Sequence, residues 1–193
     1  MTLFPVILPV VEVGHKLSGK EKVARLSRIS REALRLSAEK SGAILGELLK
    51  DEDDVPCPFD GNYWSLSHKP KCVTAVVSKE KIGIDIEELK PRSQSIFSLV
   101  ASDEEWELGK DNSWNTFFRY WTAKEATLKA VGIGIGGLKI CWVISVPDEN
   151  HIVLDYRERL FRVEQLYYEN HIIPVLKDDN EIEWIIAEDF SYC

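Results

Sequence analysis

The chain contains two long helical patterns, and each is followed by a series of short strand-like segments. The first pattern runs from Ser18 to about Leu49, and the second from about Asn115 to Val131. Runs of apolar and β-branched residues, which suit a sheet, follow both helices. They are YWSLS, CVTAVVS and KIGIDIE, then KICWVISV, HIVLDY, FRVEQLYY, HIIPVL and EIEWIIA. This element order predicts an α+β fold of two pseudosymmetric halves, each with one long helix packed on a small antiparallel sheet.

The polar segment KPRSQS separates the two series and is the candidate boundary. It predicts an N-terminal half of residues 1–92 and a C-terminal half of residues 93–193. The segment SDEEWEL, at residues 102–108, is typical of a short capped helix. The apolar opening, residues 1–14, has two prolines and no basic segment before it, so it predicts a first strand and neither a signal peptide nor a membrane span.

The distribution of charge indicates which half would meet an anionic partner. The formal net charge of −8 argues against a dedicated nucleic-acid binder. Residues 1–95 carry 15 basic and 14 acidic side chains, whereas residues 96–193 carry 9 and 18. A partner with phosphate groups would therefore favour the first half. Cysteines 57, 72, 141 and 193 form no metal-site or disulfide pattern, which together with the opening segment predicts a cytoplasmic protein.

The most basic part of the first half is its helical segment. Ser18 and Glu21 have the S-x-x-E spacing of a capping box, and Val23, Leu26, Ala33 and Leu34 provide an apolar side. Arg28 and Arg31 recur at helical spacing on another side, and Arg25 lies one turn before Arg28. These arginines could contact phosphate groups, or they could form an ordinary solvated helix face.

The segment KIGIDIEE combines alternating isoleucines with carboxylates. On a strand, Ile82, Ile84 and Ile86 would share one face, and Asp85 and Glu87 would share the other. Adjacent buried carboxylates need a cation or basic partners. A few carboxylate ligands are typical of a Mg²⁺ ion that is shared with a substrate phosphate. The alternative is a solvent-exposed acidic strand end.

The segment WTAKEATLK places charged residues on an aromatic-rich helix. Glu125 and Lys129 are four residues apart and project from one face. An ordinary surface pair is one interpretation. The neighbouring aromatic residues favour a pair that is not freely solvated. Gly132, just after this helix, is expected to end it with a positive φ angle. The G-x-G-x-x-G spacing that begins there predicts no dinucleotide site, because a helix precedes it and a strand follows.

The segment SLSHKPK brings together hydroxyl, imidazole and ammonium groups. Ser67 and His68 end a predicted strand, and Lys69 and Lys71 lie in the turn that follows. These donors would suit a phosphate group. A hydrolase nucleophile is disfavoured because a GxSxG motif is missing. A plain polar turn is the alternative.

Together, these segments resemble the 4'-phosphopantetheinyl transferase superfamily. The resemblance rests on IGID, on W-[ST]-x-K-E-[SA]-x-x-K, whose Glu125 lies forty positions after Asp85, and on the Ser67–His68 pair upstream. The chain length and the position of Glu87 relative to Asp85 are similar to those of the monomeric, surfactin-type (Sfp-like) class. One departure is VPCPFDG, residues 55–61, which has no basic residue where the family often places one.

The resemblance implies an enzyme of the holo-[acyl-carrier-protein] synthase type. It would move the phosphopantetheine group of coenzyme A to a serine of an apo acyl or peptidyl carrier protein and release adenosine 3',5'-bisphosphate. By resemblance, the metal ligands for Mg²⁺ are Asp85, Glu87 and Glu125; the catalytic residues are Asp85, Glu125 and Lys129; and the residues that bind coenzyme A are Ser67, His68, Lys124, Arg25, Arg28 and Arg31. The site would lie in the cleft between the halves, in a monomer that binds neither nucleic acid nor membrane.

Two other functions use the same residues. One is a Mg²⁺-dependent phosphohydrolase that acts on a nucleotide-like pyrophosphate. The other is a non-catalytic module that binds coenzyme A or a carrier protein. Transfer to a carrier protein, rather than to water, would distinguish the transferase from both.

Overall fold

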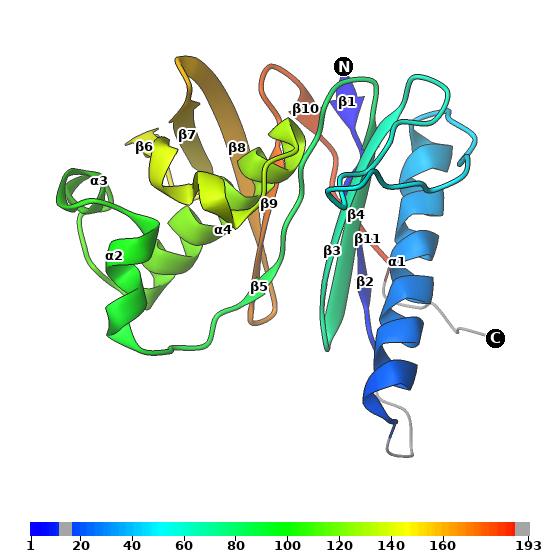
Figure 1. Cartoon of the computed structure of the whole chain (residues 1–193), viewed down its shortest axis with the longest axis horizontal. Helices are drawn as coiled ribbons and strands as arrows, with labels where there is room; N and C mark the ends of the chain where they lie inside the picture. The colour runs from blue at the N-terminus through cyan, green and yellow to red at the C-terminus, as the bar shows by residue number, and fades with distance from the viewer. Residues whose placement is uncertain (12–16, 188–193) are drawn as a thin grey trace.

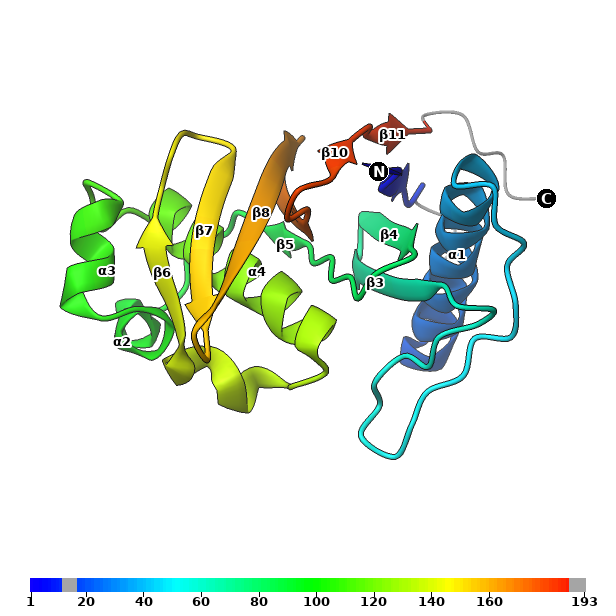
Figure 2. The ribbon, with the colours of Figure 1, turned by 90° about the horizontal axis from the view of Figure 1, so that it is seen from above.

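Two larger sheets lie side by side, and each is covered by one long helix (Figures 1 and 2). The computed structural model describes residues 1–11 and 17–187. In its N-terminal part, α1 packs against β2, β3 and β4. The elements of this part are β1 (Thr2–Leu3), β2 (Val6–Pro9), α1 (Gly19–Lys40), β3 (Tyr63–Lys69), β4 (Cys72–Ser78) and β5 (Glu87–Glu88).

The later part of the chain forms the second layer pair, in which α4 packs against β9 and β8. It begins with the helical elements η1 (Gln94–Ile96), α2 (Phe97–Val100), α3 (Asp103–Leu108), α4 (Trp114–Val131) and η2 (Ile135–Ile140). The strands that follow are β6 (Cys141–Ser145), β7 (His151–Tyr156), β8 (Arg159–Tyr168), β9 (His171–Leu176), β10 (Glu181–Ile182) and β11 (Ile185–Ile186). The α+β class is therefore confirmed.

The strand pairing connects distant parts of the chain. The first of the larger sheets has the order β11-β2-β4-β3, the second has the order β5-β9-β8-β7-β6, and β1 and β10 form a separate two-stranded sheet. All neighbours in the second sheet are antiparallel, whereas β11 is parallel to β2 and β10 is parallel to β1. The chain thus crosses between the layers twice, at β5 and again after β9. The boundary between residues 92 and 93 stays a prediction.

Helix α1 has the predicted start and a different end. Ser18 and Glu21 form the capping box, with Ser18 N donating to Glu21 Oε2 at 2.7 Å. The prediction of helix to about Leu49 was wrong, because α1 ends at Lys40. Gly42 has a φ angle of 68°, which a right-handed helix excludes. The apolar pattern continues past it because residues 43, 45 and 48 still pack on the same core.

The buried side of α1 differs in part from the predicted apolar side. Ala33 and Leu34 are buried as predicted, together with Ile29, but Val23 is 63% exposed. The apolar side therefore begins one turn later than the sequence pattern indicated. The predicted first strand is divided into β1 and β2, and residues 12–14 of that prediction lie outside the described residues.

Helices α3 and α4 match their predictions closely. Ser102 forms a capping box with Glu105 at the start of α3. Helix α4 ends at Gly132, whose φ angle of 76° confirms the expected left-handed conformation. Among the described residues, no helix combines the length and the hydropathy that a bilayer span requires. Cys57, Cys72 and Cys141 are free thiols, and Cys193 lies outside the described residues.

The KIGIDIEE segment is extended but is not one continuous strand. Only β5 pairs with β9, and Ile84 makes an isolated bridge to Val175. Gly83 lies so close to α4 that a Cβ atom there would be 1.8 Å from the Ala126 carbonyl oxygen. The segment therefore runs against the backbone of α4, which brings its carboxylates to that helix.

Candidate functional site

Asp85 is held at the contact between the two layers. Its side chain is 8% exposed, and its Oδ1 accepts a hydrogen bond from Ser67 Oγ at 2.8 Å. Lys129 Nζ lies 2.7 Å from the same oxygen and also donates to the Ile84 carbonyl at 3.1 Å. Strand β3, the IGID segment and α4 therefore meet at one carboxylate.

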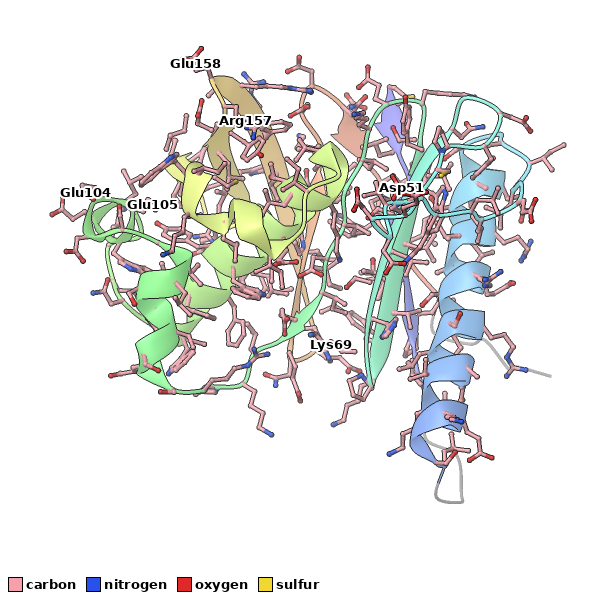
Figure 3. All side chains as sticks on the ribbon, viewed as in Figure 1. Asp51, Lys69, Glu104, Glu105, Arg157 and Glu158 are labelled. Carbon is pink, nitrogen blue, oxygen red and sulfur yellow. The ribbon has the colours of Figure 1, made fainter. Side chains whose placement is uncertain are left out.

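Glu87 is the second buried carboxylate, and two cations share it. Lys69 Nζ lies 2.8 Å from Oε1, and Arg92 Nη2 lies 3.0 Å from Oε2. The Glu87 side chain is only 9% exposed. The Arg92 guanidinium also lies over the ring of Phe118, 5.8 Å from its centroid. Figure 3 shows Lys69 at the end of β3, on the side of β5.

Glu125 completes the set of carboxylates from α4. Its Oε1 is buried and has no hydrogen-bond partner among the described residues. Burial, together with the negative charge of Asp85, raises the pKa of Glu125 to about 6, and the nearby Lys129 opposes this increase. This carboxylate therefore takes up or releases a proton closer to neutral pH than an ordinary glutamate does.

The cluster balances its charges within the protein. Its acidic members are Asp85, Glu87 and Glu125, and its basic members are Lys69, Arg92 and Lys129. Sequence reasoning expected the paired carboxylates to need a cation or basic partners, and the structure supplies basic partners from three separate segments. The pairing of Lys69 and Arg92 with Glu87 was not predicted, although Lys69 follows Ser67 by two residues and so shares its strand face.

The donor chemistry fits a hard cation. Oxygen-only ligands suit Mg²⁺, and the unpartnered Oε1 of Glu125 is a carboxylate oxygen that a cation could satisfy. Among residues 1–11 and 17–187, no three His, Cys, Asp or Glu side chains stand in a ready-made metal-binding arrangement. Lysine and arginine side chains hold Asp85 and Glu87 instead. The three carboxylates are therefore of a chemical type that Mg²⁺ binds. Binding of Mg²⁺ would require the ion pairs of Asp85 and Glu87 to rearrange.

Ser67 and His68 face opposite sides of β3. Ser67 bonds Asp85, whereas the strand alternation places His68 on the side of Trp64 and Leu66, which pack with the core under α1. Partial burial, with Lys129 and Lys69 adding to it, lowers the pKa of His68. The imidazole is therefore uncharged at neutral pH and can offer an N–H donor.

The predicted arginines lie on α1 and do not join the cluster. Arg28 and Arg31 are exposed, and Arg25 donates to the Val11 carbonyl. Helix α1 covers the face of its sheet that points away from α4 (Figure 2).

The structure places Lys124 away from the cluster as well. Its side chain is 1% exposed, and its ammonium is 2.7 Å from Glu105 Oε1. Adjacent residues of a helix point in directions about 100° apart, so Lys124 and Glu125 reach different surroundings. A contact between Lys124 and a coenzyme would require this buried ion pair to break.

Two adjoining cavities reach Lys129 from the side of the loop before β3. They measure about 200 and 350 Å³. Both are lined by Asp53, Val55, Pro56, Trp64, Lys129 and Gly132. The sequence did not predict Trp64 or Asp53 as lining residues. No local pattern indicates that the loop before β3 folds back toward α4. Lys50 and Asp54 line the smaller cavity, and Lys50 Nζ lies 3.6 Å from Asp54 Oδ1.

Comparisons with known proteins agree with this arrangement. Residues 81–183 match the family model described as the 4'-phosphopantetheinyl transferase superfamily. This range includes Asp85, Glu87, Glu125 and Lys129, and it covers more than half of the chain.

Individual relatives are similar over stretches of different length. A putative 4'-phosphopantetheinyl transferase of Haemophilus influenzae is 30% identical over 146 residues, which cover 71% of this chain and 61% of that protein. The 4'-phosphopantetheinyl transferase HetI of a Nostoc species is 36% identical over 96 residues, 46% of this chain and 40% of that protein. The transferase Sfp of Bacillus subtilis is 34% identical over 77 residues, 38% of this chain and 34% of that protein. The matched regions thus span less than two thirds of these relatives.

Proposed function

The chain belongs to the 4'-phosphopantetheinyl transferase superfamily, and we propose that it transfers the 4'-phosphopantetheine group of coenzyme A to a serine of an apo carrier protein. The other product is adenosine 3',5'-bisphosphate. The observation that carries the proposal is the meeting of Asp85, Glu87 and Glu125 with Lys129 inside the matched range. Holo-[acyl-carrier-protein] synthase activity is one form of this reaction.

In the proposed reaction, the serine Oγ attacks the phosphorus that bears pantetheine. A new O–P bond forms as the bond from this phosphorus to the bridging pyrophosphate oxygen breaks. The serine proton passes to the Glu125 carboxylate, directly or through water. Without a bound cation, the pKa of about 6 leaves this carboxylate ionised at neutral pH yet more basic than an ordinary glutamate. Lys129 stabilises the charge that develops on the leaving group.

The metal ligands in this proposal are Asp85, Glu87 and Glu125. A bound Mg²⁺ would neutralise charge on the pyrophosphate oxygens. The Lys69 ammonium and the Arg92 guanidinium both pair with Glu87, one of these proposed ligands. When Glu87 serves as a ligand, these two cations are free to contact the coenzyme's phosphates.

The coenzyme would extend from the cluster toward β3 and α1. Ser67 and His68 offer a hydroxyl and an imidazole on the two sides of β3, and the cavities beside Trp64 have room for part of the nucleotide. Arg25, Arg28 and Arg31 are proposed as contacts for its distal phosphate. We also propose that residues 1–92 and 93–193 act as two halves of a cytoplasmic monomer, with the site between them.

Mass spectrometry tests the proposed function. The protein is incubated with coenzyme A, Mg²⁺ and a panel of apo acyl and peptidyl carrier domains. We expect one carrier domain or more to gain the mass of a single phosphopantetheine group. Substitution of the acceptor serine by alanine in the carrier domain is the control and should abolish the gain. Hydrolysis of coenzyme A without a mass gain would instead indicate a phosphohydrolase, and binding without either reaction would indicate a binding module.

A further inference from the structure

A buried ion pair attaches α4 to the neighbouring helices, away from the carboxylate cluster. Lys124 Nζ lies 2.7 Å from Glu105 Oε1 and donates to the Val100 carbonyl at 2.6 Å. The Lys124 and Glu105 side chains are 1% and 5% exposed. Figure 3 shows Glu105 on α3, far from Lys69. The ammonium is therefore engaged within the C-terminal part of the chain.

Glu105 connects three elements through its own polar atoms. Its Oε1 also accepts from Val143 N of β6 at 2.7 Å, and its Oε2 accepts from Ser102 N at 2.9 Å. Tyr120 Oη donates to the Glu105 carbonyl at 2.9 Å. Tyr120 and Lys124 are one turn apart on the same side of α4. Two successive turns of α4 thus hold one residue of α3, which in turn is bonded to β6.

This attachment bears on Glu125, the next residue along α4. The buried Oε1 of Glu125 has no hydrogen-bond partner in the described part of the chain, so no hydrogen bond to that oxygen fixes its position. The place of the carboxylate then depends on the helix backbone. On the cluster side, Lys129 binds Asp85 and the Ile84 carbonyl. Attachments at two different sides of a helix restrict its rotation about its own axis.

We propose that Lys124 is a positioning residue, whose buried pair with Glu105 fixes the rotation of α4 and so places the Glu125 carboxylate in the cluster. This role replaces the phosphate contact that the family resemblance implied for Lys124. The kinetic part of the proposal rests on the proposed transferase function, whereas the structural part does not.

The test uses the double variant Lys124→Met with Glu105→Gln in the full chain. A single Lys124→Met change would leave a buried carboxylate unpaired and could prevent folding. The double variant removes both charges. Its single glutamine oxygen can accept from Val143 N or from Ser102 N but not from both, so exchange is compared over α4 and not over α3. Lys139→Met is the matched control, because exposed Lys139 lines the same cavity of about 270 Å³ beside the pair and has the same charge.

Hydrogen exchange of α4 amides decides the structural part without any substrate. We expect exchange over residues 120–128 to be about tenfold faster in the double variant than in the wild type. The affinity for coenzyme A, measured by calorimetry with Mg²⁺, should stay within about twofold. The kcat for transfer should fall about tenfold, with the KM for coenzyme A unchanged. Lys139→Met should match the wild type in all three measurements.

Either of two results would overturn the proposal. Unchanged exchange in α4 would show that the pair does not restrain the helix, whatever the kinetics. A tenfold loss of coenzyme A affinity would instead show that Lys124 contacts the coenzyme. If the wild type modified no carrier domain, the proposed function would fail, and the exchange measurement would still decide the role of Lys124.

Discussion

Glu125 combines a buried carboxylate with a pKa of about 6, against an ordinary value of 4.5. Because the folded state binds this proton more tightly than the unfolded state, its contribution to stability is complete below pH 4.5 and is lost as the pH rises to about 6. At higher pH, the folded protein remains without this contribution to its free energy of unfolding. A site that needs this group ionised therefore reduces the stability of the fold at neutral pH.

We expect Glu125→Gln to raise the free energy of unfolding by roughly 1 kcal/mol near pH 7.5, because the amide carries no partly buried charge and solvent screens part of the carboxylate's cost. The gain should vanish near pH 4, where the wild-type carboxyl is protonated. Urea denaturation at both pH values measures the difference. Glu107→Gln, at an exposed position, is the control and should show no such gain. A less stable Glu125→Gln variant near pH 7.5 would contradict the expectation.

Asp85 tests the metal proposal by a measurement that does not involve activity. Mg²⁺ that binds only the folded protein should raise the Tm of the wild type. Asp85→Asn removes the charge and keeps an oxygen that can accept from Ser67, so we expect the Mg²⁺-dependent rise in Tm to disappear. Glu107→Gln should keep it. An undiminished rise in Asp85→Asn would exclude this carboxylate as a ligand.

At the scale of elements, the IGID segment lies directly against the backbone of α4 at Gly83. An added Cβ at Gly83 would lie 1.8 Å from the Ala126 oxygen and 2.9 Å from the Ala130 nitrogen. Both are backbone atoms, so the neighbour cannot move by a simple side-chain rotation. The close approach is possible only with glycine at this position.

We therefore expect Gly83→Ala to lower the free energy of unfolding by roughly 3 kcal/mol, measured by urea denaturation. It should also reduce transfer, because Asp85 follows two residues later. Gly136→Ala is the control, since an added Cβ there meets no atom within 4 Å, and it should change stability by less than about 0.5 kcal/mol. If the two substitutions lowered the free energy of unfolding equally, the close approach of Gly83 to α4 would not explain the loss of stability.

At the scale of the whole molecule, residues 181–186 attach the end of the second layer to the first strands. Glu181 N donates to the Met1 carbonyl at 3.0 Å, and Ile185 N donates to the Pro5 carbonyl at 2.9 Å. Trp184 Nε1 bonds Glu164 of β8 at 2.9 Å. The same short segment therefore contacts both layers.

Deletion of residues 181–193 should lower the free energy of unfolding by at least about 2 kcal/mol, through lost backbone hydrogen bonds and apolar burial. Deletion of residues 188–193 alone is the control, because it leaves every described strand pairing intact. Thermal and urea denaturation of both truncations provide the comparison. If the two truncations were equally stable, β10 and β11 would not contribute to the attachment.

Local signals were sufficient for most of the helices. The capping boxes at Ser18 and Ser102 and the left-handed Gly132 were all predictable, because each depends on residues within one turn. The end of α1 was not, since the apolar spacing after Lys40 continues in an extended segment that packs on the same core. Periodicity therefore located the elements better than it located their ends.

The sequence by itself determined the α+β class, the family and the identity of the carboxylates in the candidate site. Tertiary structure decided which cations meet those carboxylates. Ser67 and Asp85 are 18 residues apart, and Asp85 and Lys129 are 44 apart. It also decided that Lys124 pairs with Glu105 while Glu125, the next residue, faces the cluster. The physical reason is range: caps and periodicity are local properties, whereas ion pairs and buried charges depend on segments that only packing brings together.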